Sequence, residues 1–211
     1  MRIHVVGLNQ GWVRVELASL REYLAATYRA HPLSMEYSGL GVERRPIASN
    51  RNRIVRDCPP EADVLVMIDS DCIPPADFLD VAELDLDIVG LPMPIWRAGE
   101  LCTGIVPLDG QRMIPVGTPE VMEVKRVAGG VLFLARRVFA HPALRGGFAD
   151  HFDEDGVLTH TEDHVYCDRA RALGFHVYAA LGYPLRHVKE VDLNQIHDAR
   201  QRHTDMAAEV G

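Results

Sequence analysis

Mostly apolar runs recur along the chain, and they predict its strands. The continuous run at residues 63–68 is typical of an interior strand covered on both faces, as in a mostly parallel sheet. The predicted strands cover residues 2–8 (RIHVVGL), 63–68 (DVLVMI), 87–94 (DIVGLPMP), 130–138 (GVLFLARRV) and 175–182 (FHVYAALG). The fourth run is expected to continue into a helical turn. Residues between the third and fourth runs are turn-rich, with short β-like pieces.

Apolar residues at helical spacing, with capping residues beside them, predict helices between these strands. The predicted helices cover residues 12–29, residues 50–57 after a cap at Ser49, a segment that begins at Ala76, and residues 162–173 between Thr161 and Gly174. The alternation of strand and helix predicts an α/β fold with a mainly parallel central sheet. We expect one domain over residues 1–190, followed by a polar tail over residues 191–211 that is predicted to be helical.

The composition is that of an ordinary globular protein. The chain has 211 residues, of which 47% are hydrophobic and 25% charged, and its formal net charge is -8. The acidic balance argues against a nucleic-acid partner, which needs a basic face. No apolar run is long enough to cross a membrane, no signal peptide is visible, and the four cysteines form no C-x-x-C pair. We therefore expect reduced thiols and a cytoplasmic location.

Two carboxylates follow the second predicted strand, in the stretch VLVMIDSDCIPP. Residues i and i+2 of a strand point to the same side, so Asp69 and Asp71 face one spot if the strand continues that far. The C-terminal end of an interior strand is where open α/β sheets bind ligands. Oxygen ligands of this kind suit Mg²⁺ or Mn²⁺, completed by water and substrate phosphates. Two solvated loop aspartates are the alternative interpretation.

This stretch resembles the D-x-D motif of the GT-A glycosyltransferases, in the form found in bacterial and phage family-2-like members. Three further blocks are similar to family elements in the same order: ASNRNRIVRDC, AGGVLFLARRVF and HTEDHVYCDRARALGFHVYAALGYPLRHV. The similarity covers roughly residues 1–190. It implies a GT-A-like α/β/α sandwich and metal-dependent transfer of a sugar, with inversion. The donor would be a nucleotide sugar such as a UDP- or GDP-sugar, and the acceptor a hydroxyl of a glycan, protein or small molecule.

The resemblance also implies roles for residues that match the family motifs. The metal, Mn²⁺ or Mg²⁺, would be held by Asp69, Asp71 and the late histidine, His187. The nucleotide would be bound by Gly7, Asn9, Asn50, Arg53, Asp69 and Ser70. The first strand departs from the family pattern, because Gly7-Leu8-Asn9-Gln10 stands where Pro-x-Tyr/Phe-Asn is usual. Arg53 has a plainer alternative role, a helix salt bridge to Asp57.

The remaining assignments concern the acceptor. In inverting family members the aspartate of the E-D pair is the general base on the acceptor hydroxyl, which assigns this role to Asp163 and leaves Glu162 in reserve. Acidic residues also favour the first turn of a helix for dipole reasons alone. Gly129 and Gly130 are expected to let the sugar or acceptor approach the backbone, unless they form a bulge or turn. Trp96 is expected either to stack on a sugar or base or to anchor a loop.

Other activities stay open at this stage. A retaining transferase differs only in where the acceptor lies. A haloacid-dehalogenase-type phosphatase also has D-x-D after an apolar strand, but Ile73 stands where Thr or Val is expected. A nucleotidyltransferase needs a glycine-rich basic loop, for which GLNQGW supplies little. A non-catalytic nucleotide- or glycan-binding module would bind donor without turnover.

Overall fold

The structure of the chain is a computed structural model, which describes residues 1–8, 34–35, 46–97, 100–110 and 121–188. The helix predicted over residues 12–29, the tail over residues 191–211 and the nucleotide-site residue Asn9 lie outside the described residues.

A seven-stranded sheet forms the centre of the described chain, in the order β2-β1-β3-β11-β5-β14-β9. Its strands are β1 (Ile3–Leu8), β2 (Ser34–Met35), β3 (Val64–Asp69), β5 (Ile88–Gly90), β9 (Val121–Val124), β11 (Val131–Ala135) and β14 (Val177–Ala180). Five of these strands run in one direction, whereas β11 and β9 run antiparallel to their neighbours. The sheet is therefore mixed, more so than predicted. A continuous apolar run indicates burial on both faces but carries no information about strand direction, which is why β11 was not recognised as antiparallel.

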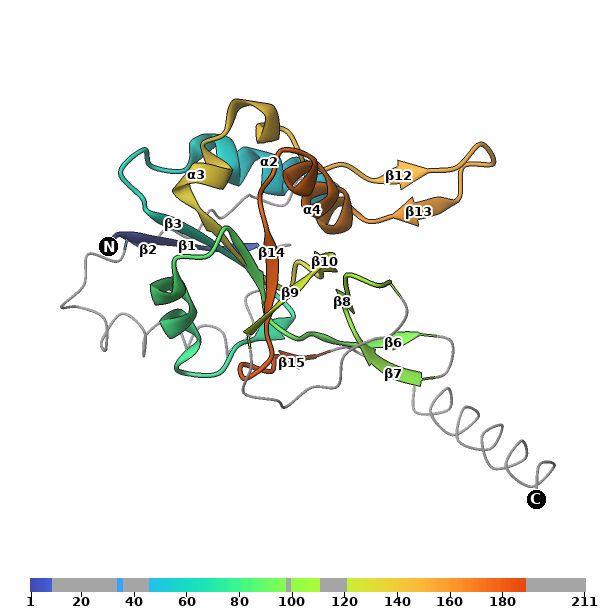
Figure 1. The fold of residues 1–211 in the computed structure, drawn as a ribbon, viewed down its shortest axis with the longest axis horizontal. Coiled ribbons are helices and arrows are strands. Elements are labelled where there is room, and N and C mark those ends of the chain that lie inside the picture. Colours follow the sequence, from blue (N-terminus) through green and yellow to red (C-terminus); the bar gives the residue numbers. More distant parts are fainter. Residues whose placement is uncertain (9–33, 36–45, 98–99, 111–120, 189–211) are drawn as a thin grey trace, which may run out of the picture.

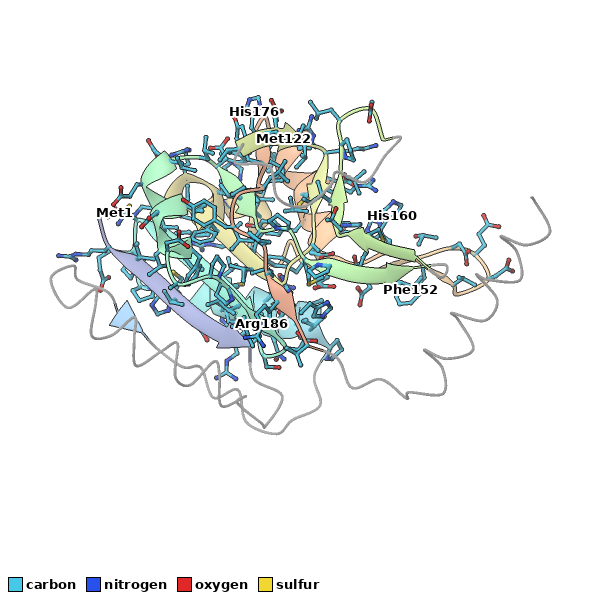
Figure 2. The ribbon with its side chains drawn as sticks, turned by 90° about the horizontal axis from the view of Figure 1, so that it is seen from below. Met1, Met122, Phe152, His160, His176 and Arg186 are labelled. Atoms are coloured by element: carbon cyan, nitrogen blue, oxygen red, sulfur yellow. The ribbon has the colours of Figure 1, made fainter. Side chains whose placement is uncertain are left out.

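Short ladders surround this sheet. They pair β4 (Cys72–Ile73) with β15 (Arg186–His187), β6 (Pro94–Arg97) with β7 (Glu100–Thr103), β8 (Ile105–Val106) with β10 (Arg126–Val127), and β12 (His151–Phe152) with β13 (Leu158–His160). The β12–β13 hairpin, which the sequence pattern did not predict, projects beyond the end of α4 (Figure 1). Phe152 and His160 are labelled on its two strands in Figure 2.

The helices largely follow the prediction. They are α2 (Ile47–Asp57), the single turn α3 (Arg136–Phe139) directly after β11, α4 (Glu162–Ala172), and the 3₁₀ helices η1 (Phe78–Leu84) and η2 (Pro142–Leu144). Helix α2 begins earlier than expected, because Pro46 and not Ser49 is its N-cap. Thr161 does precede α4, and Gly174 follows it with a φ of 89° that favours glycine. The helix expected from Ala76 is the 3₁₀ helix η1.

Alternating strand residues divide the core into two clusters, one on each face of the sheet. On one face Leu65 and Met67 pack with residues of α2 and α4, and these two helices contact each other (Figure 1). On the other face Val64 and Val66 pack with residues of η1. Among the described residues, α2, α3 and α4 therefore cover one face and η1 the other. None of the described helices is both long enough and apolar enough to span a bilayer.

Several chain segments meet at the C-terminal edge of β3. The parallel register pairs Leu8 with Asp69, so β1 ends beside β3. Strand β11 runs the opposite way and begins at this edge, where Gly130 accepts a hydrogen bond from the Asp69 N–H at 2.9 Å. Strand β4 follows β3 after a two-residue turn and pairs with β15, on which Figure 2 labels Arg186. Side chains distant in sequence are thereby gathered at one edge.

Candidate active site

A fully buried arginine lies beneath this edge. Arg51 of α2 is 1% exposed, and its Nη2 donates to both carboxylate oxygens of Asp69, at 2.9 and 3.1 Å. Its Nε lies 3.2 Å from Glu162 Oε1 at the start of α4. Burial opposes the charge on Arg51, but the acidic neighbours Asp69, Glu162 and Asp163 outweigh it and raise the pKa of the guanidinium. Arg51 therefore joins the end of β3 to the start of α4 by ion pairs.

The guanidinium fits only because residue 129 has no side chain. A Cβ built on Gly129 would lie 1.9 Å from Arg51 Nη1. The space left by this glycine is thus occupied by Arg51, and the approach of a sugar or acceptor to Gly129 and Gly130 stays a prediction. Within the described chain, Nε and Nη1 of Arg51 have no hydrogen-bond partner, so the ion pairs carry most of the compensation for burying this charge.

The Asp163 carboxylate is fixed by three donors. Its Oδ2 accepts from the backbone N–H of Gly129 at 2.7 Å, and its Oδ1 accepts from the Thr161 hydroxyl at 2.5 Å and the His164 N–H at 2.7 Å. Thr161 therefore bonds to the side chain of Asp163 and makes no side-chain cap on α4. These bonds tie the first turn of α4 to the glycine pair that precedes β11.

Glu162, the neighbouring carboxyl group, has a different environment. Its side chain is 7% exposed and lies against Arg51. Burial raises the pKa of Glu162 from 4.5 to about 7; Arg51 opposes this shift, whereas Asp163 and Asp150 add to it. A carboxyl group with a pKa near neutrality exchanges a proton within the range in which enzymes work.

Asp71 and His187 form the second half of the site. The β4–β15 ladder brings them together, and His187 Nε2 lies 3.3 Å from Asp71 Oδ2. The other ring nitrogen, Nδ1, lies 2.7 Å from the carbonyl oxygen of Pro94 and can only donate to it. With Nδ1 donating to Pro94, Nε2 is the nitrogen that a neutral His187 offers to a metal beside Asp71, which is the usual arrangement of a metal-binding histidine.

A third potential ligand belongs to the same group. The ligand atoms of Asp71, Cys72 and His187 all lie within 4.8 Å of one another. Carboxylate, imidazole and thiol groups at such separations fit a divalent cation. The side chains present therefore suit a divalent cation, as the family resemblance implies.

The two aspartates of the D-x-D stretch make different contacts. The expectation that they face one spot assumed that the strand continues to Asp71, but β3 ends at Asp69 and residues 70–71 form a turn. Asp69 turns to Arg51 and Asp71 turns to His187. Because the alternation of side chains holds only within a strand, sequence spacing could not place them correctly.

The other residues predicted for the site do not all lie beside Asp71 and His187. Arg53 is 46% exposed and forms the i,i+4 ion pair with Asp57 at 3.3 Å, the plainer of its two expected roles. Gly7 lies in β1 opposite Ile68, near the edge, and Ser70 lies in the turn after β3. Asn50 lies in α2 beside Arg51, with its side chain half-buried. Trp96 lies in β6 opposite Leu101, and its side chain is outside the described residues.

Sequence reasoning missed Arg51, although a signal for it exists. Arg51, Ile54, Val55 and Cys58 follow the i, i+3, i+4, i+7 pattern of one helix face, and the first three are buried. A charged residue on the apolar face of a helix indicates a buried ion pair. Asn52 was also missed; its side-chain amide donates to the Phe148 carbonyl at 2.7 Å and accepts from the Phe148 N–H at 2.9 Å.

Comparisons with known proteins identify the fold. No family model matches the chain, and no curated protein matches it. Among solved structures, A197 from STIV is 18% identical with a TM-score of 0.56, and the match covers 90% of this chain and 87% of that one. A mutant of Drosophila β1,4-galactosyltransferase 7, in complex with manganese, UDP-Gal and xylobiose, is 16% identical with a TM-score of 0.52, over 90% and 71% of the two chains.

A third similar structure is that of GalNAc-T7 with UDP, GalNAc and Mn²⁺. It is 12% identical with a TM-score of 0.52, and the match covers 90% of this chain but only 43% of the longer GalNAc-T7 chain. At these identities the likeness establishes a shared fold. The chain thus has a mixed α/β fold with a central sheet, similar to that of GT-A-like glycosyltransferases.

The ion pairs of Arg51 predict a large difference between two arginines of the same helix. Replacing Arg51 with Ala leaves Asp69 and Glu162 without their buried partner, so the free energy of unfolding should fall by about 3–5 kcal/mol. Arg53→Ala is the matched control, and its exposed pair with Asp57 should be worth only about 0.3–0.5 kcal/mol. Urea unfolding of both variants measures the difference, and equal losses would contradict the assignment of Arg51 as the central ion-pair partner.

The raised pKa of Glu162 predicts a pH-dependent stability. A carboxyl group with a higher pKa in the folded than in the unfolded state stabilises the fold below its unfolded pKa, and this contribution is lost as pH rises through the folded pKa. Relative to Glu162→Gln, the wild-type protein should therefore lose unfolding free energy between pH 4.5 and about 7. Urea unfolding across this range tests the prediction, and parallel pH profiles for the two proteins would refute it.

Proposed function

We propose that this chain is a metal-dependent glycosyltransferase that moves a sugar from a nucleotide-sugar donor to an acceptor hydroxyl with inversion. The observation that carries this proposal is the Asp71–His187 pair, 3.3 Å apart at the C-terminal edge of β3. That edge is where sheets of this kind bind ligands. Further support comes from the fold, because two structures similar to it contain UDP or UDP-Gal together with manganese.

A divalent cation, Mn²⁺ or Mg²⁺, would be held by Asp71 and His187. The bound cation would supply Lewis-acid stabilisation of the charge that develops on the leaving diphosphate. Asp69, which the sequence also assigned to the metal, is proposed instead to keep the motif in place through its two hydrogen bonds from Arg51.

The nucleotide would lie along the ends of β1 and β3. Gly7 and Ser70 lie there, and Asn9 follows β1 in the sequence. We propose a UDP- or GDP-sugar as the donor, and retain Asn50 and Trp96 as further contacts to donor or acceptor. Arg53 is the weakest of the nucleotide assignments, because Asp57 already pairs with it.

We propose Asp163 as the general base. An acceptor hydroxyl becomes a good nucleophile when a carboxylate takes its proton as the new bond forms. The hydrogen bonds from Gly129, Thr161 and His164 hold the Asp163 carboxylate in one orientation, and its Oδ2 receives only one of the three. Glu162 remains the reserve base, and its pKa of about 7 is the observation in its favour.

Isosteric substitutions separate these roles. With the nucleotide sugar that releases most nucleoside diphosphate in a screen, Asp163→Asn should lower the transfer rate by about 10²–10⁴-fold, the usual worth of a general base. Nucleoside diphosphate binding, followed by calorimetry, should change little. Asp168→Asn is the matched control on the same helix. Asp168 forms an ion pair with Arg126, with an N–O distance of 2.8 Å, and has no proposed role in the site, so this variant should keep the wild-type transfer rate.

Three other outcomes are informative. A loss of turnover in Glu162→Gln but not in Asp163→Asn would move the base to Glu162. Normal turnover in both variants would contradict an inverting mechanism with either base. Absence of turnover with every donor, although diphosphate binds, would leave a binding module and overturn the proposed activity.

A further inference from the structure

We propose that Cys72 is a third protein ligand of the metal, so that the site prefers a borderline cation such as Zn²⁺ or Co²⁺ to Mg²⁺. This inference rests on the metal site of the proposed function and adds the identity of the cation class to it. The family resemblance assigned no role to this cysteine.

The strand register places the thiol correctly. Cys72 and His187 are directly opposite each other in the antiparallel β4–β15 ladder, so their side chains lie on the same face. Cys72 Sγ lies 3.7 Å from Asp71 Oδ1, and His187 Nε2 lies 3.3 Å from Asp71 Oδ2. In a tetrahedral zinc site, bond lengths of about 2.0–2.3 Å separate neighbouring ligand atoms by roughly 3.3–3.8 Å. The two contacts involve different oxygens of Asp71, and the three ligand atoms lie within 4.8 Å of one another, so small side-chain shifts would bring them around such an ion.

The Cys72 thiol is also buried against Met93. Cys72 is 0% exposed, and its Sγ lies 3.6 Å from Met93 Sδ. A Cβ on Gly130 would lie 2.5 Å from Met93 Sδ and 2.8 Å from Cys72 Sγ, so the absence of a side chain at Gly130 leaves room for both sulfur atoms. The more exposed side of the site is formed by Asp71, whose side chain is 26% exposed.

The chemistry of this ligand set differs from that of two aspartates. Carboxylates and water suit Mg²⁺ and Mn²⁺, whereas thiolate and imidazole favour Zn²⁺ and related ions. Binding would break the S–H bond, release the proton to solvent and form a sulfur–metal bond with the electron pair left on sulfur. Three protein ligands leave a position open for a diphosphate oxygen, as in catalytic zinc sites.

Cobalt(II) absorption tests the inference without relying on activity. Titration of the purified protein with Co²⁺ should produce an ultraviolet sulfur-to-cobalt charge-transfer band that saturates at one equivalent. The band should vanish in Cys72→Ser and in Cys72→Ala, and persist in the control Cys102→Ser, which changes a thiol outside the cluster. Zinc affinity of Cys72→Ser, measured with a competing chelator, should fall at least by the roughly 10–100-fold that loss of an outer-shell partner already costs.

The outcomes separate this inference from the proposed function. Cobalt binding that is lost in Asp71→Asn but shows no charge-transfer band in the wild-type protein would overturn the role of Cys72 and leave the Asp71–His187 site standing. A band that survives in both Cys72 variants would place the thiolate elsewhere and likewise overturn it. Failure of the wild-type protein to bind Co²⁺, Zn²⁺ or Mn²⁺ with nucleoside diphosphate present would overturn both.

Discussion

The candidate site depends on the ion pairs of the buried Arg51 guanidinium. It pairs with Asp69 at the end of β3 and with Glu162 at the start of α4, two elements that the chain separates widely. Removing an ion from water costs several kcal/mol, and such a group is kept only when its partners are fixed around it. Gly129 provides the space, and the helix contact between α2 and α4 provides the framework.

The ion pair between Arg51 and Asp69 also gives Asp69 and Asp71 different partners. Asp69 faces Arg51 beneath the edge of the sheet, while the turn at residues 70–71 directs Asp71 to His187. The second pair is fixed from a different direction, by the β4–β15 ladder and by the bond between His187 Nδ1 and the Pro94 carbonyl. The proposed metal ligands and the proposed acid–base pair, Asp163 and Glu162, thus lie at one edge, linked through the Asp69–Arg51–Glu162 chain.

The sequence predicted much of this fold because its strands are strong local signals. Strands β3 and β11 lie in apolar runs, β1 is mostly apolar, and α4 is preceded by Thr161 and followed by Gly174. Direction in the sheet, the turn after Asp69 and the β12–β13 hairpin depend on tertiary contacts or on short exposed segments, so no local pattern specified them. Motifs drew attention to Asp163, Asp71 and His187, and the structure brings Asp71 and His187 together. Arg51 was not predicted, because the motif comparison selected Arg53 and a charged residue is usually exposed.

Manganese-edge anomalous diffraction from crystals grown with Mn²⁺ and UDP tests the central claim most directly. We expect a single strong peak between Asp71 and His187, with Asp69 still bonded to Arg51 and Arg51 still beside Glu162. A manganese peak away from Asp71 and His187, or an Arg51 that has left Asp69 to bind the nucleotide, would contradict it.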